Sequence, residues 1–232
     1  MNYKLVVLTG AGISAESGIK TFRDDDGLWE GHDVNEVATP QGFQRNPDKV
    51  HEFYNERRRK LLEVQPNEAH KYLATLEEDF EVYIITQNID DLHERAGSSH
   101  VLHLHGELLK IRSIQDPARV IEWREDLSTG YRDEDQHSYR PHVVWFGEAV
   151  PLLDEAAMIC QKADICLVIG TSLQVYPAAS LLDYCPVNTP IVYVDPNPGD
   201  TDHFTNQSQI EVLPYKATKS IPYLDKKLSD LK

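Results

Sequence analysis

Residues 8–23 read Leu-Thr-Gly-Ala-Gly-Ile-Ser-Ala-Glu-Ser-Gly-Ile-Lys-Thr-Phe-Arg, and this stretch decides the fold. It directly follows the apolar run at residues 5–8 and leads into a helix-compatible segment. A glycine turn in that position lets a strand turn sharply into a helix, whose positive N-terminal end then faces bound phosphates. We predict that Gly10 makes the tight turn, that Gly12 admits a pyrophosphate to the backbone, and that Ala15 permits close helix–sheet packing. A strand–helix connection without a ligand is the alternative.

The loop after this turn departs from an ordinary dinucleotide-binding domain. Such a domain completes a second strand and ends it with an acidic residue about 20 positions on. Residues 21–29 are instead polar and contain a glycine. A long loop beside a nucleotide site is usually functional or disordered. Phe22 is placed to cover a ring and Arg23 to pair with a phosphate, while a packing phenylalanine and a solvated arginine are the alternatives.

Composition bounds the class of protein. The chain has 232 residues, 41% of them hydrophobic, which suffices for one large domain with a smaller insertion. No run approaches the roughly 20 apolar residues of a membrane span, and Met1 leads into the first strand without a signal-peptide pattern, so we expect a cytoplasmic protein. The net charge of −15 argues against binding to nucleic acid or to anionic membranes. It suits lysine-bearing protein partners, or it serves solubility alone.

Three cysteines, Cys160, Cys166 and Cys185, lie in the C-terminal half without a CxxC pair. Their spacing fits neither a disulfide framework nor a zinc site. We therefore expect buried thiols that pack as small hydrophobic groups. The sequence does not indicate an oligomeric state.

Apolar, β-branched runs of strand length alternate with segments of helical periodicity. The predicted strands are Lys4–Leu8, Val82–Thr86, Val101–Leu104, Val143–Phe146, Ile165–Ile169, Ile191–Val194 and Ile210–Leu213. The predicted helices are Pro47–Glu63, Asn67–Glu78, Asp90–Ala96, Leu152–Ala163, Pro177–Tyr184 and Ile221–Leu231. This alternation predicts an α/β fold, a Rossmann-like doubly wound parallel sheet that is buried on both faces.

Two stretches break the alternation. Residues 27–66 are polar and helical, and residues 106–142 are charged, with single apolar residues rather than a core pattern. We interpret them as insertions that together build a smaller inserted domain. The large nucleotide-binding subdomain would then comprise approximately residues 1–26, 67–105 and 143–232.

Polar side chains follow several predicted strands, where the ligand crevice of an open α/β sheet lies. Gln87 and Asn88 are suited to bond ribose hydroxyls and Asp90 to accept from a carboxamide, with helix capping as the alternative for Asn88 or Asp90. Period-two alternation places His103 and His105 on one face of the next strand. We predict that His105, at the strand end, is a general base and that His103 packs. A metal site built on the two histidines lacks an evident third ligand.

Two further strand ends complete the set. Gly170-Thr171-Ser172 repeats the pattern of the first turn and is suited to hold a phosphate or a ribose. Asp195 ends the strand at residues 191–194, where it can bond the adenosine ribose that the missing second strand leaves unattended. Asn197 is placed to assist it.

The motifs together resemble the sirtuins, in order and spacing and over nearly the whole chain. The matching stretches are Gly10-Ala11-Gly12-Ile13-Ser14, Thr21-Phe22-Arg23, Thr86-Gln87-Asn88-Ile89-Asp90, His105-Gly106, Val143-Val144-Trp145-Phe146-Gly147-Glu148 and Gly170-Thr171-Ser172. The resemblance is strongest to the short bacterial members. It implies an enzyme that removes acyl groups from protein lysines with NAD as cosubstrate. In that chemistry the acyl oxygen attacks C1′ of the nicotinamide ribose, nicotinamide leaves, a histidine activates a ribose hydroxyl, and O-acyl-ADP-ribose is released.

The resemblance implies a role for each matching residue. His105 corresponds to the catalytic base and Asn88 to a residue that orders the ribose during catalysis. The segment containing Val143, Phe146 and Gly147 corresponds to one that pairs with the substrate backbone as an added strand. The implied NAD-binding residues are Gly10, Ala11, Gly12, Ser14, Phe22, Arg23, Gln87, Asn88, Ile89, Asp90, Gly170, Thr171, Ser172, Asp195, Asn197 and, by a weaker match, Ala217.

One further match bears on the acyl group. Tyr54 and Arg57 stand at i and i+3, on one helix face. In the sirtuin branch called class III, a Tyr-x-x-Arg pair lies in the acyl pocket and binds the terminal carboxylate of succinyl or malonyl lysine, for which the arginine fork is suited. The resemblance therefore implies a desuccinylase and demalonylase, with deacetylation left open. A solvated basic face at residues 57–59 is the alternative.

The chain departs from the sirtuin pattern at two places. Sirtuins usually carry two cysteine pairs that bind a structural zinc, but residues 106–142 contain no cysteine, so we expect no zinc and a small subdomain held by packing. The order Asp195-Pro196-Asn197 replaces the usual Asn followed two residues later by Glu, which leaves the ribose contacts open. The candidate packing residues are Ile111, Ile114, Val120, Ile121, Trp123 and Tyr131.

Two other functions fit the same motifs. A mono-ADP-ribosyltransferase would pass the ribosyl group to a protein acceptor. A noncatalytic sensor of NAD or ADP-ribose would account for the missing zinc cysteines. A sensor needs no base, so His105, Asn88 and Asp90 argue against it.

Overall fold

The structure is a computed structural model that describes residues 3–20, 28–29, 31–173, 176–198 and 210–231. The strands are β1 (Lys4–Thr9), β2 (Leu28–Trp29), β3 (His32–Asp33), β4 (Glu81–Thr86), β5 (Val101–His103), β6 (Gly106–Ser113), β7 (Val120–Glu122), β8 (Tyr139–Val143), β9 (Ile165–Ile169), β10 (Ile191–Val194) and β11 (Ile210–Leu213). The α-helices are α1 (Ala11–Ala15), α2 (Val34–Val37), α3 (Pro40–Arg45), α4 (Pro47–Glu63), α5 (Glu68–Thr75), α6 (Leu92–Ala96), α7 (Leu153–Cys160) and α8 (Ala217–Asp230). The 3-10 helices are η1 (Leu76–Glu78) and η2 (Ala178–Tyr184).

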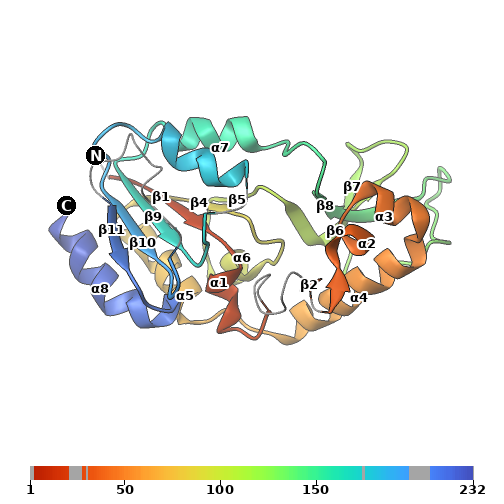
Figure 1. The fold of residues 1–232 in the computed structure, drawn as a ribbon, viewed down its shortest axis with the longest axis horizontal. Helices are drawn as coiled ribbons and strands as arrows, with labels where there is room; N and C mark the ends of the chain where they lie inside the picture. Colours follow the sequence, from red (N-terminus) through yellow and green to blue (C-terminus); the bar gives the residue numbers. More distant parts are fainter. Residues whose placement is uncertain (1–2, 21–27, 30, 174–175, 199–209, 232) are drawn as a thin grey trace.

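The central sheet is parallel and doubly wound. Among the described residues it has six strands in the order β11-β10-β9-β1-β4-β5. The chain starts at the centre with β1, adds β4 and β5 on one side, and then adds β9, β10 and β11 on the other, which is the strand order of dinucleotide-binding folds. Helix α7 covers one face and helices α5 and α8 cover the other (Figure 1). The predicted Rossmann-like α/β fold is confirmed.

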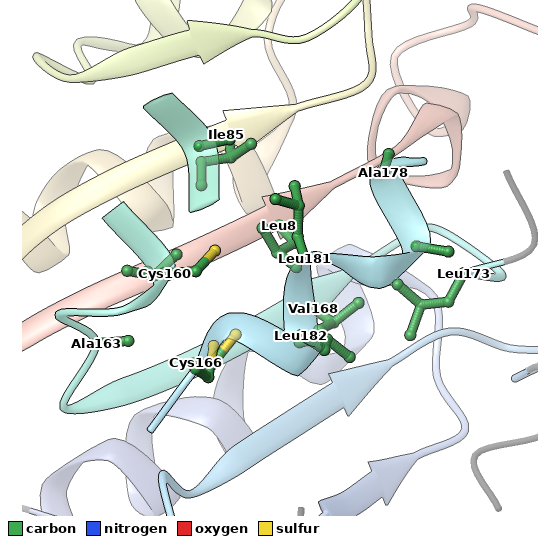
Figure 2. Packing of buried hydrophobic residues seen from close by; sticks show 14 of the residues in the cluster. Leu8, Ile85, Cys160, Ala163, Cys166, Val168, Leu173, Ala178, Leu181 and Leu182 are labelled. Carbon is green, nitrogen blue, oxygen red and sulfur yellow. The ribbon is translucent and has the colours of Figure 1, made fainter. Parts of the chain in front are cut away.

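Alternate residues of β1 pack into two cores on opposite faces of the sheet. Val6 and Leu8 belong to the core that includes Cys160 of α7, part of which Figure 2 shows. Leu5 and Val7 belong to the core beneath α5 and α8. Burial on both faces explains why the strands read as continuous apolar runs. The three cysteines are buried thiols that pack in the first core, as predicted.

A second group of elements lies beside the parallel sheet (Figure 1) and consists of α2, α3, α4 and the antiparallel sheet β7-β6-β8. Helix α4 begins after Asn46, whose side chain accepts a hydrogen bond from the N–H of Lys49, and Pro47 occupies its first turn. Its buried face repeats at helical spacing and packs on β6 and β8. The residues of that face include Val50, Phe53, Tyr54, Arg57, Arg58 and Leu61.

The structure corrects several predicted elements. The segment 143–146 does not form a strand of the parallel sheet, because Val143 ends β8 and pairs antiparallel with Gly106. Residues 106–142 contain β6, whose charged residues alternate with buried ones, so the charge hid a strand. The segment 178–184 is a 3-10 helix rather than an α-helix, and the last helix begins at Ala217 rather than Ile221. Other bounds differ by a few residues.

The small antiparallel sheet has a core of its own. Ile111 packs there with Leu127 and Tyr139, which the sequence analysis did not select, and three predicted residues pack against this cluster: Ile121, Trp123 and Tyr131. The prediction is wrong for Ile114, which is 45% exposed. Val120 is half-buried outside the cluster.

The described residues include no group of three or more His, Cys, Asp or Glu side chains close enough together to bind a metal ion. Zinc-free folding and the subdomain boundaries stay predictions. No described helix has the length and apolar content needed to cross a membrane.

Candidate active site

A cavity of about 880 Å³ lies at the carboxyl ends of the parallel strands and reaches α4. Strand pairing places these ends side by side, because their last residues are partners in register across neighbouring strands: Thr9, Thr86, Ile169 and Val194. The residue after each of these ends lines the cavity: Gly10, Gln87, Gly170 and Asp195. The cavity thus occupies the switch point between β1 and β9, where open α/β sheets bind ligands.

The two glycine turns at this switch point pack against each other. The N–H of Gly12 donates to the carbonyl oxygen of Gly170 over 2.8 Å. A Cβ atom on Gly12 would lie 2.7 Å from Gly170 Cα, and Gly170 has a φ of +66°, which favours glycine. The N–H of Gly12 is therefore already used within the protein. The predicted contact with a pyrophosphate would depend on close approach to the Gly12 backbone and not on a hydrogen bond from this N–H.

Ser14 holds the two polar residues that follow β4. Its Oγ accepts from Asn88 Nδ2 over 3.1 Å and donates to Asp90 Oδ2 over 3.0 Å. Ser14 is fully buried and is not part of the cavity lining, so the structure places it behind the predicted NAD-binding residues. Because the amide nitrogen of Asn88 faces Ser14, its carbonyl oxygen points elsewhere. Burial raises the pKa of Asp90 to about 6, against the opposing hydrogen bonds from the Leu92 N–H and from Ser14.

His70 supports Ser14 from helix α5. Its Nδ1 accepts from the N–H of Asn67, so the ring proton is on Nε2, which lies 3.4 Å from Ser14 Oγ and donates to it. Burial lowers the pKa of His70 to about 4, which keeps the ring neutral. Ser14 Oγ therefore accepts two hydrogen bonds and donates one, and this fixes the direction of its own proton toward Asp90.

His105 has the geometry of a general base. Its Nδ1 donates to the carbonyl oxygen of Gln87 over 3.0 Å, which leaves Nε2 as the nitrogen without a proton. The half-buried ring lines the cavity, and its burial lowers the pKa, with the Gln87 bond in partial opposition. The neutral form, which a base requires, is thus favoured.

His103 differs from His105 in position and in environment: His103 ends β5, whereas His105 lies in the turn between β5 and β6. Both of its ring nitrogens face acceptors, the carbonyl oxygen of Asn88 at 2.9 Å and Glu94 Oε1 at 2.7 Å, so both donate and the ring is charged. Burial alone would lower the pKa of His103, but Glu94 raises it above its ordinary value. His103 is buried and absent from the cavity lining, as the predicted packing role requires.

The far end of the cavity is formed by α4 and the segment after β8. Arg57 lines this end and is 7% exposed. Its Nη1 donates to the Phe53 carbonyl oxygen over 2.6 Å, and its guanidinium lies 3.2 Å from the centroid of the Phe53 ring. Tyr54 also lines this end, and its hydroxyl oxygen accepts from Trp145 Nε1 over 3.0 Å. Burial raises the pKa of Tyr54, so its hydroxyl keeps its proton.

The three consecutive arginines of α4 have three different environments. Only Arg57 reaches the cavity. Arg58 is buried and donates to the carbonyl oxygens of Leu108 and Glu125, so it ties α4 to the neighbouring segments. Arg59 forms ion pairs at the surface, and its side chain is 48% exposed. The alternative of a uniformly solvated basic face is therefore wrong.

The segment after β8 is held by Glu148, to which the sequence analysis gave no role. Its carboxylate accepts from the N–H of Trp145 at 2.8 Å, from Arg140 at 2.7 and 3.0 Å, and from Arg112 at 3.2 and 3.3 Å. The signal in the sequence was a carboxylate directly after Phe-Gly, with Arg112 and Arg140 near the two ends of the 106–142 insertion. This cluster fixes Trp145, whose side chain the sequence analysis also left without a role.

The structure brings most predicted site residues to one cavity. Those that line it are Gly10, Ala11, Gly12, Tyr54, Arg57, Gln87, Asn88, Ile89, Asp90, His105, Val143, Phe146, Gly147, Gly170, Thr171, Ser172, Asp195, Asn197 and Ala217. The predicted residues Phe22 and Arg23 lie outside the described residues. Gln87 donates through Nε2 to Thr171 Oγ1 over 3.1 Å, which ties the two halves of the sheet together across the cavity floor.

Comparisons with known proteins agree with this arrangement. A family model described as Sir2 family matches residues 10–177. A Helicobacter pylori protein (strain ATCC 700392 / 26695) named NAD-dependent protein deacylase is 62% identical over 192 residues, which cover 83% of this chain and 84% of the relative. A protein of the same name from Bacteroides thetaiotaomicron is 52% identical over 226 residues, which cover 95% of each chain.

Solved structures give the same result. The crystal structure of a Sir2 homolog–NAD complex is 38% identical, with a TM-score of 0.85, and the match covers 100% of this chain and 91% of that one. A structure of Sir2 bound to acetylated peptide is 29% identical, with a TM-score of 0.80, and the match covers 98% and 94% of the two chains. The chain therefore belongs to the Sir2 family.

Proposed function

We propose that the protein is an NAD-dependent protein-lysine deacylase with a preference for acidic acyl groups, succinyl and malonyl. The observation that carries the proposal is the position of His105, a neutral imidazole whose unprotonated Nε2 belongs to the same cavity as Asn88, Tyr54 and Arg57. One ligand crevice thus contains a base, ribose-directed polar groups and a cation for an acyl carboxylate. The names of the relatives support the deacylase activity.

The cavity fits NAD as cosubstrate. Its volume of about 880 Å³ lies in the upper range of small-molecule sites, which span roughly 300–1,000 Å³. The donors and acceptors at the strand ends, among them Gln87, Asn88 and Asp195, are those that ribose hydroxyls and a carboxamide require. NAD supplies an electrophilic ribose carbon once its nicotinamide leaves. The chain's own part is to orient the ribose through the Asn88 amide and to accept a hydroxyl proton at His105 Nε2.

The preference for acidic acyl groups follows from the far end of the cavity. A carboxylate in a mostly apolar pocket is costly to desolvate unless a cation pairs with it. Arg57 supplies that cation, and Tyr54 supplies a hydroxyl proton. Val143, Phe146 and Gly147 line the same cavity and are proposed to contact the peptide backbone around the acyl-lysine. The cytoplasmic location of the protein stays a prediction.

The experiment is to incubate the purified protein with NAD and a succinyl-lysine peptide, and to analyse the products by mass spectrometry. We expect the deacylated peptide, nicotinamide and O-succinyl-ADP-ribose in equal amounts. ADP-ribose attached to a protein acceptor would identify the transferase alternative, which the names of the relatives do not favour. Binding of NAD without any product would identify the sensor.

A further inference from the structure

We propose that Trp145 is a positioning residue for acyl specificity, because its indole N–H sets the direction of the Tyr54 hydroxyl proton. The inference rests on the proposed preference for acidic acyl groups. Trp145 is not proposed to touch the acyl group itself. It acts through Tyr54, whose hydroxyl is aligned to donate to the terminal carboxylate of a dicarboxylic acyl chain.

The contact between the two side chains is buried and leaves one direction for the proton. Trp145 Nε1 lies 3.0 Å from Tyr54 Oη, and the residues are 2% and 0% exposed. An indole N–H is only a donor, so the tyrosine oxygen accepts. A phenol proton prefers the plane of its ring, where it has two positions on opposite sides of the oxygen. A donor on one side confines the proton to the other side.

Among the described residues, the Tyr54 hydroxyl has a hydrogen bond to its oxygen from Trp145 but no acceptor for its proton. A buried hydroxyl usually finds partners for both its proton and its lone pairs. Tyr54 lies in the wall of the same cavity as Arg57 but is 0% exposed, so a neighbouring side chain must shift for a ligand to reach its hydroxyl. A carboxylate that pairs with the guanidinium there is the acceptor that completes the hydroxyl. The methyl group of an acetyl chain cannot accept a hydrogen bond.

The indole is itself held rigidly, which a directing role requires. The Arg140 guanidinium lies over it, 3.2 Å from the ring centroid, and the Phe43 ring packs at 5.2 Å between centroids. The backbone N–H of Trp145 donates to Glu148, which also binds Arg140. The side chain is thus fixed at its ring and at its backbone, and its N–H has one direction.

The test uses two replacements of Trp145 that differ in how much they disturb packing. Trp145→Phe removes the N–H and part of the ring, whereas 3-benzothienylalanine at position 145 keeps the shape and replaces the N–H by sulfur. Each variant is assayed with NAD and matched succinyl-lysine and acetyl-lysine peptides. We expect kcat/KM for the succinyl peptide to fall roughly three- to ten-fold, the effect of one hydrogen bond, with little change for the acetyl peptide.

A double-mutant cycle with Tyr54→Phe isolates the pair. Without the Tyr54 hydroxyl there is no proton to direct, so benzothienylalanine at position 145 should have no further effect on the ratio of succinyl to acetyl turnover. An effect of the same size in both backgrounds would show that the indole acts through packing alone. Equal losses for both peptides would lead to the same conclusion, and either result overturns the inference.

The parent protein and Arg57→Met separate this inference from the proposed function. If the parent protein does not prefer the succinyl peptide, or if Arg57→Met leaves that preference intact, the proposed function and the inference both fail. If Arg57→Met abolishes the preference while benzothienylalanine at position 145 retains it in full, only the role of Trp145 is refuted.

Discussion

Replacement of Arg57 by methionine tests the proposed acyl pocket directly. Methionine replaces the aliphatic stem of the arginine with an unbranched apolar side chain, but it removes the guanidinium and its contact with the Phe53 ring. Arg57 is 7% exposed, so water does not readily take its place against a bound carboxylate. A hydrogen-bonded charge pair that loses one partner at such a site costs more than an exposed ion pair, about 2–4 kcal/mol in transition-state binding. That range corresponds to a roughly 30-fold to 1,000-fold loss in kcat/KM for a succinyl peptide.

The assay measures kcat/KM for succinyl-lysine and acetyl-lysine in one peptide sequence at saturating NAD. Acetyl turnover should change little, because a methyl group makes no use of the guanidinium. Arg59→Met is the matched control, since it removes the same charge from the same helix at a position that faces solvent. That variant should retain the kinetics of the parent protein for both peptides.

Arg57 does not bind the acyl group if Arg57→Met lowers turnover of both peptides equally, because the arginine then supports the fold of α4 instead. The same conclusion follows if Arg59→Met reproduces the selective loss, because long-range charge would then explain the preference. Tyr54→Phe should give a smaller loss of the same sign as Arg57→Met, since it removes a neutral donor rather than a cation.

Three further predictions concern the base, the pH profile and metal. His105→Ala should abolish turnover while NAD binding, measured by calorimetry, largely survives, and near-normal turnover would refute its assignment as the base. The acid limb of the kcat/KM profile should lie below pH 6.5, because burial lowers the pKa of His105 from that value. Asp90, with a pKa of about 6, must also be deprotonated for activity. An acid limb above pH 7 would contradict this prediction. The purified protein should contain no stoichiometric zinc and keep its melting temperature in a chelator, whereas one zinc per chain by metal analysis would show that other side chains replace the cysteines.

The strand-end residues were predictable because the chemistry of an open α/β sheet is local in sequence. Gln87, Asn88 and Asp90 follow one apolar run directly, and Gly170 follows another. Parallel strands in register must bring such positions to one edge, whatever the order of the strands. The fold and the family were therefore confirmed, and the predicted residues of these turns line one cavity.

The interior partners of these residues were not predictable, because they depend on contacts between distant segments. Ser14 was assigned to the cofactor through its motif, yet its hydroxyl is enclosed by Asn88, Asp90 and His70. Likewise Gly12 was assigned to a phosphate, while its N–H is bonded to Gly170. A sequence pattern indicates which backbone is close to a ligand, but it does not show which polar groups the protein itself already uses.

Ion pairs connect the small antiparallel sheet to the cavity. Arg112 and Arg140 lie on β6 and β8, the strands of the small sheet, and together they hold Glu148. Glu148 in turn fixes Trp145, whose indole N–H donates to Tyr54 at the end of the cavity proposed to bind the acyl group. The packing of the small sheet therefore bears on the position of the residues proposed to select the acyl group. The apolar core of that sheet and these ion pairs contribute rigidity to the wall of the proposed acyl pocket.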